Sequence, residues 1–162
     1  NPPTIGVDPS SPGSCIPQPV LWPRESALPA DASGPQTQGQ TIDQTGHCLT
    51  NAEYWFEEGC YILEYLNCAQ DSAVSVARAR VPVGGQTRWH KLRGIRERYI
   101  LLEGRGVVEV GHAPARAVGP GEVVQIAPGQ RQRIRNTGPT DLVFLAVCTP
   151  RFDPACYEDC DT

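Results

Sequence analysis

The sequence contains no methionine, only three histidines, and no apolar run that approaches the roughly 18 residues of a membrane span. The chain begins at Asn1, so the lack of methionine predicts a mature chain from which an initiator and a signal peptide have been removed. We therefore expect a secreted protein with no membrane partner.

Any C-x-x-C pair is absent as well, and the closest cysteines, Cys156 and Cys160, lie in an acidic tail without histidine. This spacing argues against a structural zinc site. The seven cysteines instead indicate an oxidising compartment, with up to three disulfides and one thiol left over. Cys148 follows the apolar run 142–147, and we predict that it is the buried free thiol.

The formal net charge of −4 hides an uneven distribution, because residues 78–135 hold twelve of the fourteen basic side chains and only four acids. Such a strip indicates a solvated face, and the alternatives are an anion-binding rim or a docking surface for the acidic terminal segments. We expect no nucleic-acid partner, since the basic residues are spread along strands with few aromatics and the whole chain is acidic.

Residues 1–46 are rich in Pro, Ser, Gly, Thr and Gln, which predicts an irregular N-terminal arm. A short turn or helix is expected over 47–58, with Asn51 as its N-cap. From there on, short β-prone runs separated by glycine and proline predict an all-β barrel or jelly roll. The predicted strands are Cys60–Leu66, Ala73–Val81, Thr87–Leu92, Glu97–Leu102, Gly106–Val110, Arg116–Val118, Glu122–Ile126, Gln132–Asn136 and Leu142–Cys148.

Two segments carry a family resemblance. Residues 84–104, GGQTRWHKLRGIRERYILLEG, resemble the first cupin motif, and residues 121–136, GEVVQIAPGQRQRIRN, resemble the second. The matching positions are Gly84, His90, Glu97, Gly104, Gly121, Gly129 and Asn136. The resemblance implies a cupin-type double-stranded β-helix, a jelly-roll barrel, as a single domain over 47–162. It also implies a depleted version of a three-histidine, one-glutamate metal site, because Leu92 and Gln132 replace two histidines and Ala127 replaces a proline.

Strand alternation predicts which side chains converge inside this barrel. His90, Glu97 and Gln132 are expected to face inward and to hold the metal. Glu97 and Tyr99 are the candidate catalytic residues, and Arg88 and Tyr99 are the candidate substrate contacts. Two alternatives stay open: His90 and Glu97 as a hydrogen-bonded core pair without metal, or Glu97 as a general base that needs none.

Mixed nitrogen and oxygen donors suit one transition metal ion, with copper favoured and iron, manganese or nickel as alternatives. The favoured function is a secreted mononuclear oxidoreductase that acts on extracellular sugars or polysaccharide. The alternatives are a sugar isomerase, epimerase or lyase, and a non-catalytic module that binds a sugar or an anion. We expect a small-molecule or carbohydrate substrate. We also expect a homodimer, because Trp89, Ile100 and Leu102 face outward and need cover.

Overall fold

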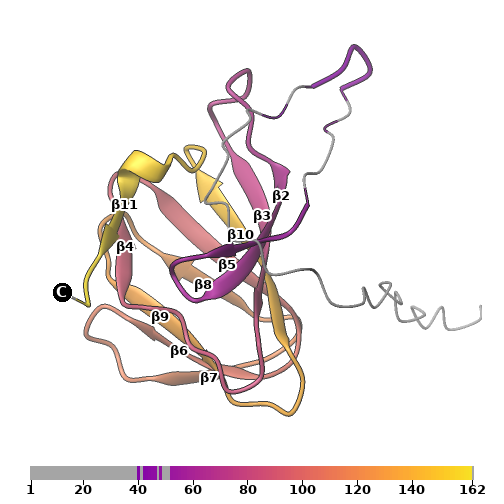
Figure 1. The fold of residues 1–162 in the computed structure, drawn as a ribbon. Coiled ribbons are helices and arrows are strands. Elements are labelled where there is room, and N and C mark those ends of the chain that lie inside the picture. The colour runs from indigo at the N-terminus through magenta and orange to yellow at the C-terminus, as the bar shows by residue number, and fades with distance from the viewer. Residues whose placement is uncertain (1–39, 41, 47, 49–51, 162) are drawn as a thin grey trace, which may run out of the picture. The chain divides into compact units, whose positions relative to one another are not determined.

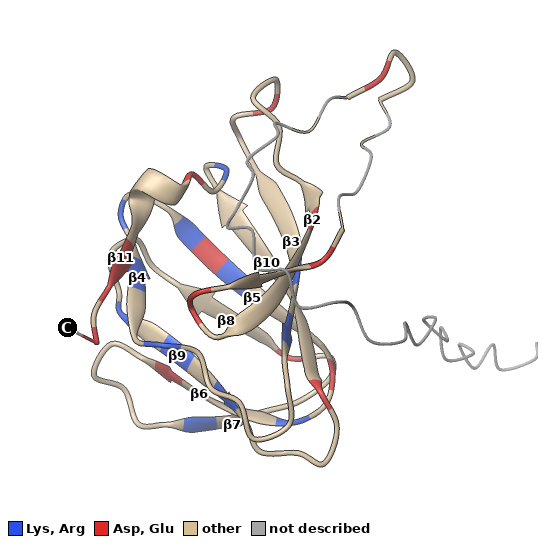
Figure 2. Cartoon of the chain, viewed as in Figure 1, with Lys and Arg blue, Asp and Glu red and all other residues tan. Residues whose placement is uncertain are grey.

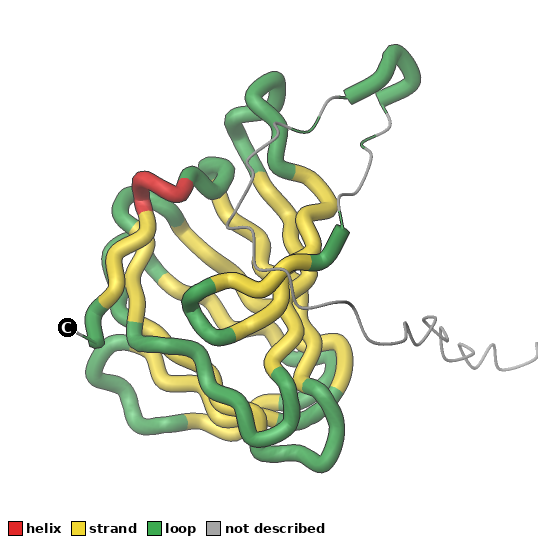
Figure 3. The backbone as a smooth tube through the Cα atoms, viewed as in Figure 1, coloured by secondary structure: helices red, strands yellow, loops and turns green. Residues whose placement is uncertain are grey.

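Short antiparallel strands separated by turns make up most of the structure, a computed structural model that describes residues 40, 42–46, 48 and 52–161 (Figure 1). In this part of the chain the helical element is one 3₁₀ turn at Pro154–Cys156 (Figure 3). The strands are β1 (Tyr54–Phe56), β2 (Cys60–Leu66), β3 (Ser75–Val81), β4 (His90–Leu92), β5 (Arg96–Glu103), β6 (Gly106–Val110), β7 (Arg116–Val118), β8 (Val123–Ile126), β9 (Gln132–Asn136), β10 (Leu142–Thr149) and β11 (Tyr157–Asp159).

The strands form two sheets, in the orders β1-β2-β3-β10-β5-β8 and β11-β4-β9-β6-β7. Strand β10 lies in the middle of the first sheet and pairs with β3 on one side and β5 on the other. In the second sheet β4 lies between β11 and β9, and His90 is directly opposite Gln132. The predicted jelly-roll barrel is therefore the observed fold.

Alternation of side chains along the strands builds the core between the two sheets. On β3 the buried positions are Ser75, Ala79 and Val81, as the sequence pattern predicts. Phe144 from the first sheet shares one apolar cluster with Ile134 from the second. Full burial of a side chain of this size contributes about 1.5–3 kcal/mol. This shared core holds the sheets together and fixes the phase of every inward-facing residue.

Outside the barrel, Arg78 and Arg80 of β3 converge on Glu53. Their guanidinium groups lie 2.7 and 2.6 Å from its carboxylate oxygens. Burial raises the pKa of Glu53, but the hydrogen bonds and charges of Arg80 and Arg78 outweigh it, so the pKa lies below its ordinary value. The arginines on the outer face of β3 are therefore held in ion pairs with Glu53.

Three segments differ from the sequence predictions. The turn or helix expected over 47–58 is wrong for Tyr54–Phe56, which forms β1 because its aromatics pair along β2. Strand β11 was not predicted; it pairs with β4, where its Glu158 forms an ion pair with Lys91. The strand expected from Thr87 begins only at His90, since the Arg88 amide donates to the Glu58 carbonyl instead.

The six described cysteines are free thiols, so none of the expected disulfides joins two of them. Cys148 is buried and unpaired, as predicted, and Cys60 and Cys68 are too. Cys15, His47 and most of the predicted arm lie outside the described residues, so the domain boundary at 46/47 stays a prediction.

Trp89 is not left as bare apolar surface. The guanidinium carbons of Arg131 and Arg133 each lie 4.5 Å from its ring centroid. The homodimer expected partly from this residue stays a prediction. Within the described part of the chain, no helix has the length and apolar character needed to cross a membrane.

Candidate functional site

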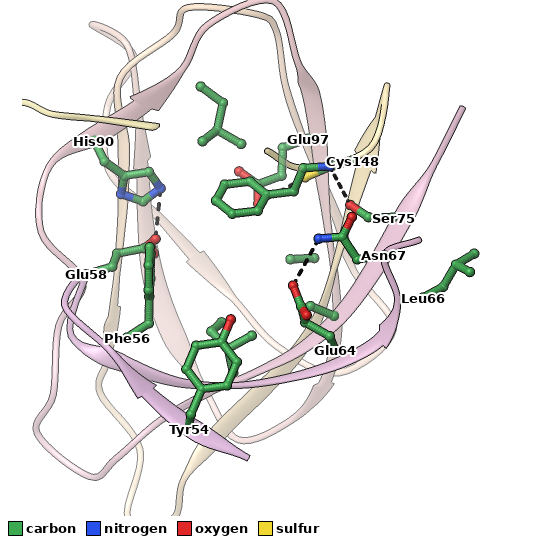
Figure 4. A pocket seen from close by; sticks show the side chains of 15 residues that line it. Tyr54, Phe56, Glu58, Glu64, Leu66, Asn67, Ser75, His90, Glu97 and Cys148 are labelled. Carbon is green, nitrogen blue, oxygen red and sulfur yellow. Dashed lines mark hydrogen bonds and ion pairs between the residues drawn. The ribbon is translucent and has the colours of Figure 1, made fainter. Parts of the chain in front are cut away.

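A pocket with about 540 Å³ of empty space, including its mouth, lies among residues from both sheets and from the β1–β2 turn. Figure 4 shows His90 and Glu58 facing one another on one side, and Glu64 and Asn67 on the other. No lysine or arginine is among the described lining residues.

His90 is the first residue of β4 and is buried in this pocket. Its Nδ1 lies 2.9 Å from the carbonyl oxygen of Arg88. A carbonyl can only accept, so Nδ1 carries the proton and Nε2 keeps its lone pair. Burial is the main reason that the pKa of His90 lies below its ordinary value, so the ring is neutral near pH 7.

Glu58 is the residue that the sequence analysis missed. Its Oε1 lies 3.6 Å from Nε2 of His90, and its side chain is only 14% exposed. Burial raises the pKa of this carboxyl to about 8. A carboxyl with that pKa is mostly protonated at neutral pH and can present a proton to its surroundings.

Gly59 explains how Glu58 reaches the site. It has a φ of +105°, and a Cβ at this position would lie 2.8 Å from the carbonyl oxygen of Gln86. Only glycine allows the β1–β2 turn to approach the chain ahead of β4 so closely. The turn is held there by the bond from the Arg88 amide to the Glu58 carbonyl, at 2.7 Å. The sequence signal that could have identified Glu58 is an acidic residue followed by glycine between two β-prone runs.

Glu97 projects inward from β5 and connects the two sheets. Its Oε2 accepts a hydrogen bond of 2.5 Å from Nε2 of Gln132 on β9, and the Cys148 thiol lies 3.8 Å from its Oε1. Burial, followed by the charge of Glu58, raises the pKa of Glu97 to about 7. Two carboxyl groups with raised pKa values therefore share the pocket with a neutral imidazole.

The other two predicted site residues lie elsewhere. The expectation that Arg88 faces the interior is wrong: its side chain is 47% exposed and pairs with Asp159 at 3.1 Å. Alternation does not extend to Arg88 because β4 begins after it. Tyr99 is buried in the core, its ring 4.4 Å from that of Phe144, and it does not line the pocket. No structural observation supports a catalytic or substrate-binding role for either residue.

The nitrogen and oxygen atoms of these side chains are of the kinds that transition metals bind. The pocket is lined by the imidazole of His90 and by the raised-pKa carboxyls of Glu58 and Glu97. Gln132 lies next to Glu97, and its buried Oε1 has no hydrogen-bond partner among the described residues. Nitrogen and oxygen donors of this kind suit copper, iron, manganese or nickel. Across residues 52–161 and the described positions before them, no three His, Cys, Asp or Glu side chains converge as a metal site. His90, Glu97 and Gln132 are the residues that would hold a metal, with Glu58 beside His90.

Comparisons with known proteins agree with this fold. Residues 77–148 match the cupin domain. An uncharacterized protein of Methanocaldococcus jannaschii is 33% identical over 108 residues, which cover 65% of this chain and 83% of that protein. The oxalate-binding protein of Thermotoga maritima is 40% identical over 73 residues, covering 44% of this chain and 58% of that protein.

A solved structure from Klebsiella pneumoniae, an uncharacterized protein with a double-stranded β-helix domain, has the same fold. Its TM-score is 0.56 at 16% identity, over 67% of this chain and 90% of that one. At this identity the likeness bears on the fold alone.

Proposed function

The chain belongs to the cupin superfamily, and from this premise we propose that it is a small-molecule enzyme in which Glu58 and Glu97 transfer protons. The observation that carries the proposal is the placement of two carboxyl groups and the buried His90 in one pocket, whose described lining residues include no lysine or arginine. The reaction class that fits is the elimination or isomerisation of a hydroxylated organic molecule. This is the isomerase or lyase alternative of the sequence analysis.

The environments of the two carboxyls assign their roles. Glu58, with its pKa raised to about 8 by burial, is the proton donor. Glu97, with a pKa of about 7, is ionised in a large fraction of molecules at neutral pH and is the base. Groups that titrate close to the working pH are the most effective acids and bases. Nε2 of His90 accepts from a hydroxyl of the substrate or from Glu58, and so orients the donor.

The atoms balance without a redox partner. In an elimination, the Glu97 carboxylate takes a C–H proton, and the electron pair of that bond becomes the new C=C bond. The C–O bond breaks, and the Glu58 proton leaves with the hydroxyl group as water. In the isomerisation of a hydroxyketone, Glu97 takes the C–H proton while Glu58 protonates the carbonyl oxygen, which gives an enediol. Glu97 then returns its proton to the neighbouring carbon, and the hydroxyl on the other carbon gives its proton back to Glu58 as the new carbonyl forms. Both routes require only groups that line the pocket.

The charge of the pocket points to an uncharged substrate. Glu58, Glu64 and Glu97 all line it, and Tyr54 and Phe56 supply an aromatic wall. A free dianion such as oxalate, which the Thermotoga relative binds by name, would be repelled by the ionised Glu97 and would meet no lysine or arginine among the described lining residues, unless a cation accompanied it. We therefore expect a compact polyhydroxy compound or hydroxyketone, without a carboxylate or phosphate.

Proton transfer to carbon can be tested without knowing the substrate in advance. The chelator-treated protein is incubated in D₂O with a panel of neutral sugars and hydroxyketones, and deuterium incorporation or loss of water is followed by NMR and mass spectrometry. Glu58→Gln and Glu97→Gln keep the side-chain shape but remove the transferable proton or the base. Glu103→Gln, an exposed position on the same strand as Glu97, is the matched control.

The proposal predicts exchange or elimination in the wild-type protein and in Glu103→Gln, with a loss of about 100-fold or more in each pocket variant. If the Glu58→Gln and Glu97→Gln proteins fold normally and turn over at the wild-type rate, the assigned roles are wrong. No turnover of any neutral compound, together with turnover of an anion after metal is added, would favour the second candidate.

The second candidate is the metal-dependent oxidoreductase, copper favoured, that acts on extracellular sugars or polysaccharide. The observation in its favour is the buried Oε1 of Gln132, which has no hydrogen-bond partner among the described residues and belongs to a side chain that lies against Glu97 and opposite His90. A bound transition metal would supply Lewis-acid or redox chemistry. This chain's residues would hold it, keep the His90 ring neutral and shield the pocket with apolar walls. The secreted location stays a prediction from composition.

Metal content of the natively purified protein separates the two candidates, with isothermal titration of Cu(II), Mn(II), Fe(II) and Ni(II) into the chelated protein as a second measurement. His90→Ala should abolish binding, because it removes the imidazole of the pocket, and Gln132→Ala should weaken it less. The control is His112→Ala, which lies exposed in a turn. Equal binding by the wild type and His90→Ala would place the metal elsewhere.

A further inference from the structure

The C-terminal segment 154–161, called the strap here, lies along the strand that carries His90. Its β11 pairs residue by residue with β4, so that Tyr157 is opposite Leu92 and Asp159 is opposite His90. Two further backbone bonds fix its ends, from the Arg93 amide to the Cys156 carbonyl at 2.8 Å and from the Cys160 amide to the Trp89 carbonyl at 2.7 Å. The strap is the edge of the five-stranded sheet beside the site.

Tyr157 of the strap stacks on the imidazole of His90. The two ring centroids are 5.3 Å apart with an interplanar angle of 18°. Phe56, which lines the pocket, meets the same tyrosine edge-on at 5.4 Å and 78°. His90 is otherwise held by one hydrogen bond, from Nδ1 to the Arg88 carbonyl. One such bond fixes a point on the ring, whereas a stacked ring also fixes its plane.

From this geometry we propose that Tyr157 is a positioning residue: it holds the plane of the His90 ring, and so keeps Nδ1 on the Arg88 carbonyl, which fixes the tautomer, and Nε2 toward Glu58. The Tyr157 hydroxyl is buried and has no hydrogen-bond partner in the described structure. The ring therefore carries the positioning effect, and the hydroxyl does not contribute to it. The use of this arrangement in catalysis rests on the proposed function, whereas the positioning itself does not.

Charge pairing keeps the strap in place. Figure 2 shows β11, red where it is acidic, alongside β4, which carries blue. Glu158 lies 2.8 Å from the Lys91 ammonium and 3.3 Å from the Arg93 guanidinium, and Asp159 lies 3.1 Å from Arg88. All of these side chains are partly exposed, so each pair is individually weak and is screened by salt. The order of His90 should therefore depend on ionic strength.

The test is NMR of protein labelled with ¹⁵N-histidine. The sequence has three histidines, so His90→Gln identifies the His90 signals by subtraction. The wild type should show the neutral tautomer with the proton on Nδ1. Tyr157→Phe, which keeps the ring, should retain that pattern and the wild-type stability, since the lost hydroxyl has no partner. Tyr157→Ala should lose the single tautomer and show exchange between the two forms.

The matched control is Trp55→Ala, which removes a larger aromatic ring from the neighbouring hairpin, where it meets Tyr61 edge-on and does not contact His90. It should leave the His90 signals unchanged. A folded Tyr157→Ala protein with the wild-type tautomer pattern would overturn the proposal, and so would the same change in Trp55→Ala.

A second measurement keeps the proposal testable if Tyr157→Ala does not fold. In Glu158→Gln/Asp159→Asn the tyrosine is intact and only the charge pairs are lost. Amide hydrogen exchange of residues 157–160 should accelerate, and the His90 tautomer pattern should begin to average. High salt should produce the same changes in the wild type. Unchanged exchange in both cases would show that charge does not hold the strap. Faster exchange with a fixed His90 tautomer would show that the strap does not position His90.

Discussion

Oε1 of Glu58 lies 3.6 Å from Nε2 of His90, although Glu58 belongs to the turn of the β1–β2 hairpin and His90 to a different sheet. The acid is therefore supplied from outside the two sequence segments that define the family resemblance. Its position depends on the close approach at Gly59 and on the backbone bond from Arg88.

Stability should fall as the pH rises from about 5 to 9. Burial raises the pKa values of Glu58 and Glu97 to about 8 and 7, above those of the unfolded chain. The folded state therefore binds more protons than the unfolded state across this range, and the free energy of unfolding decreases with pH. The total effect is on the order of a few kcal/mol.

Thermal or urea unfolding across this pH range measures the effect. In Glu58→Gln/Glu97→Gln the dependence should largely disappear, because neither position titrates. Wild-type stability that rises between pH 5 and 9 would contradict the assignment of raised pKa values.

Gly59→Ala should destabilise the protein by about 1–3 kcal/mol, because a Cβ at φ +105° is strained and would meet the Gln86 carbonyl. The β1–β2 turn would move away, and Glu58 would leave His90. Urea unfolding measures the stability, and the deuterium exchange assay measures the site. Gly119→Ala is the control, since its φ is ordinary and its Cβ would meet nothing within 4 Å. Similar losses in both variants would refute the role of Gly59.

Leu92→His should raise the affinity for Cu(II) or Ni(II) by about tenfold or more, because it restores a second imidazole to a pocket that already holds His90 and Glu97. Leu92 is buried, so the variant should also lose about 1–3 kcal/mol of stability. Metal titration measures the gain in affinity. Leu66→His, which places an imidazole at another position on the lining of the same pocket, is the control. An unchanged affinity would indicate that metal does not bind beside His90.

Under native conditions, alkylation followed by mass spectrometry should label Cys156 and Cys160 quickly and leave Cys60 and Cys148 unmodified. Burial raises the pKa of both protected thiols well above the usual range, and the thiolate is the reactive form. In denaturant without reductant, all six described cysteines should react. About one reactive thiol would instead support the disulfides expected from an oxidising compartment.

The sequence allowed most of the strands to be predicted, because alternation and glycine spacing are local signals. The inward phase of His90, Glu97 and Gln132 followed from the same alternation. Glu58 and Tyr157 could not be found in this way, since a turn and a C-terminal strand bring them to the site through tertiary contacts. Arg88 was misplaced because alternation was applied to a residue that precedes the strand.

The strand order has a consequence for how the chain folds. The central strand of the six-stranded sheet, β10, is nearly the last strand in the sequence, and its partner β3 ends at Val81. Until Leu142–Thr149 have been synthesised, β3 and β5 have no strand between them, and the edges that pair with β10 stay open. Such non-local pairing slows folding, and exposed strand edges promote aggregation. A ribosome-bound chain that stops before β10 should therefore need a chaperone, and completion of β10 should be the step that releases it.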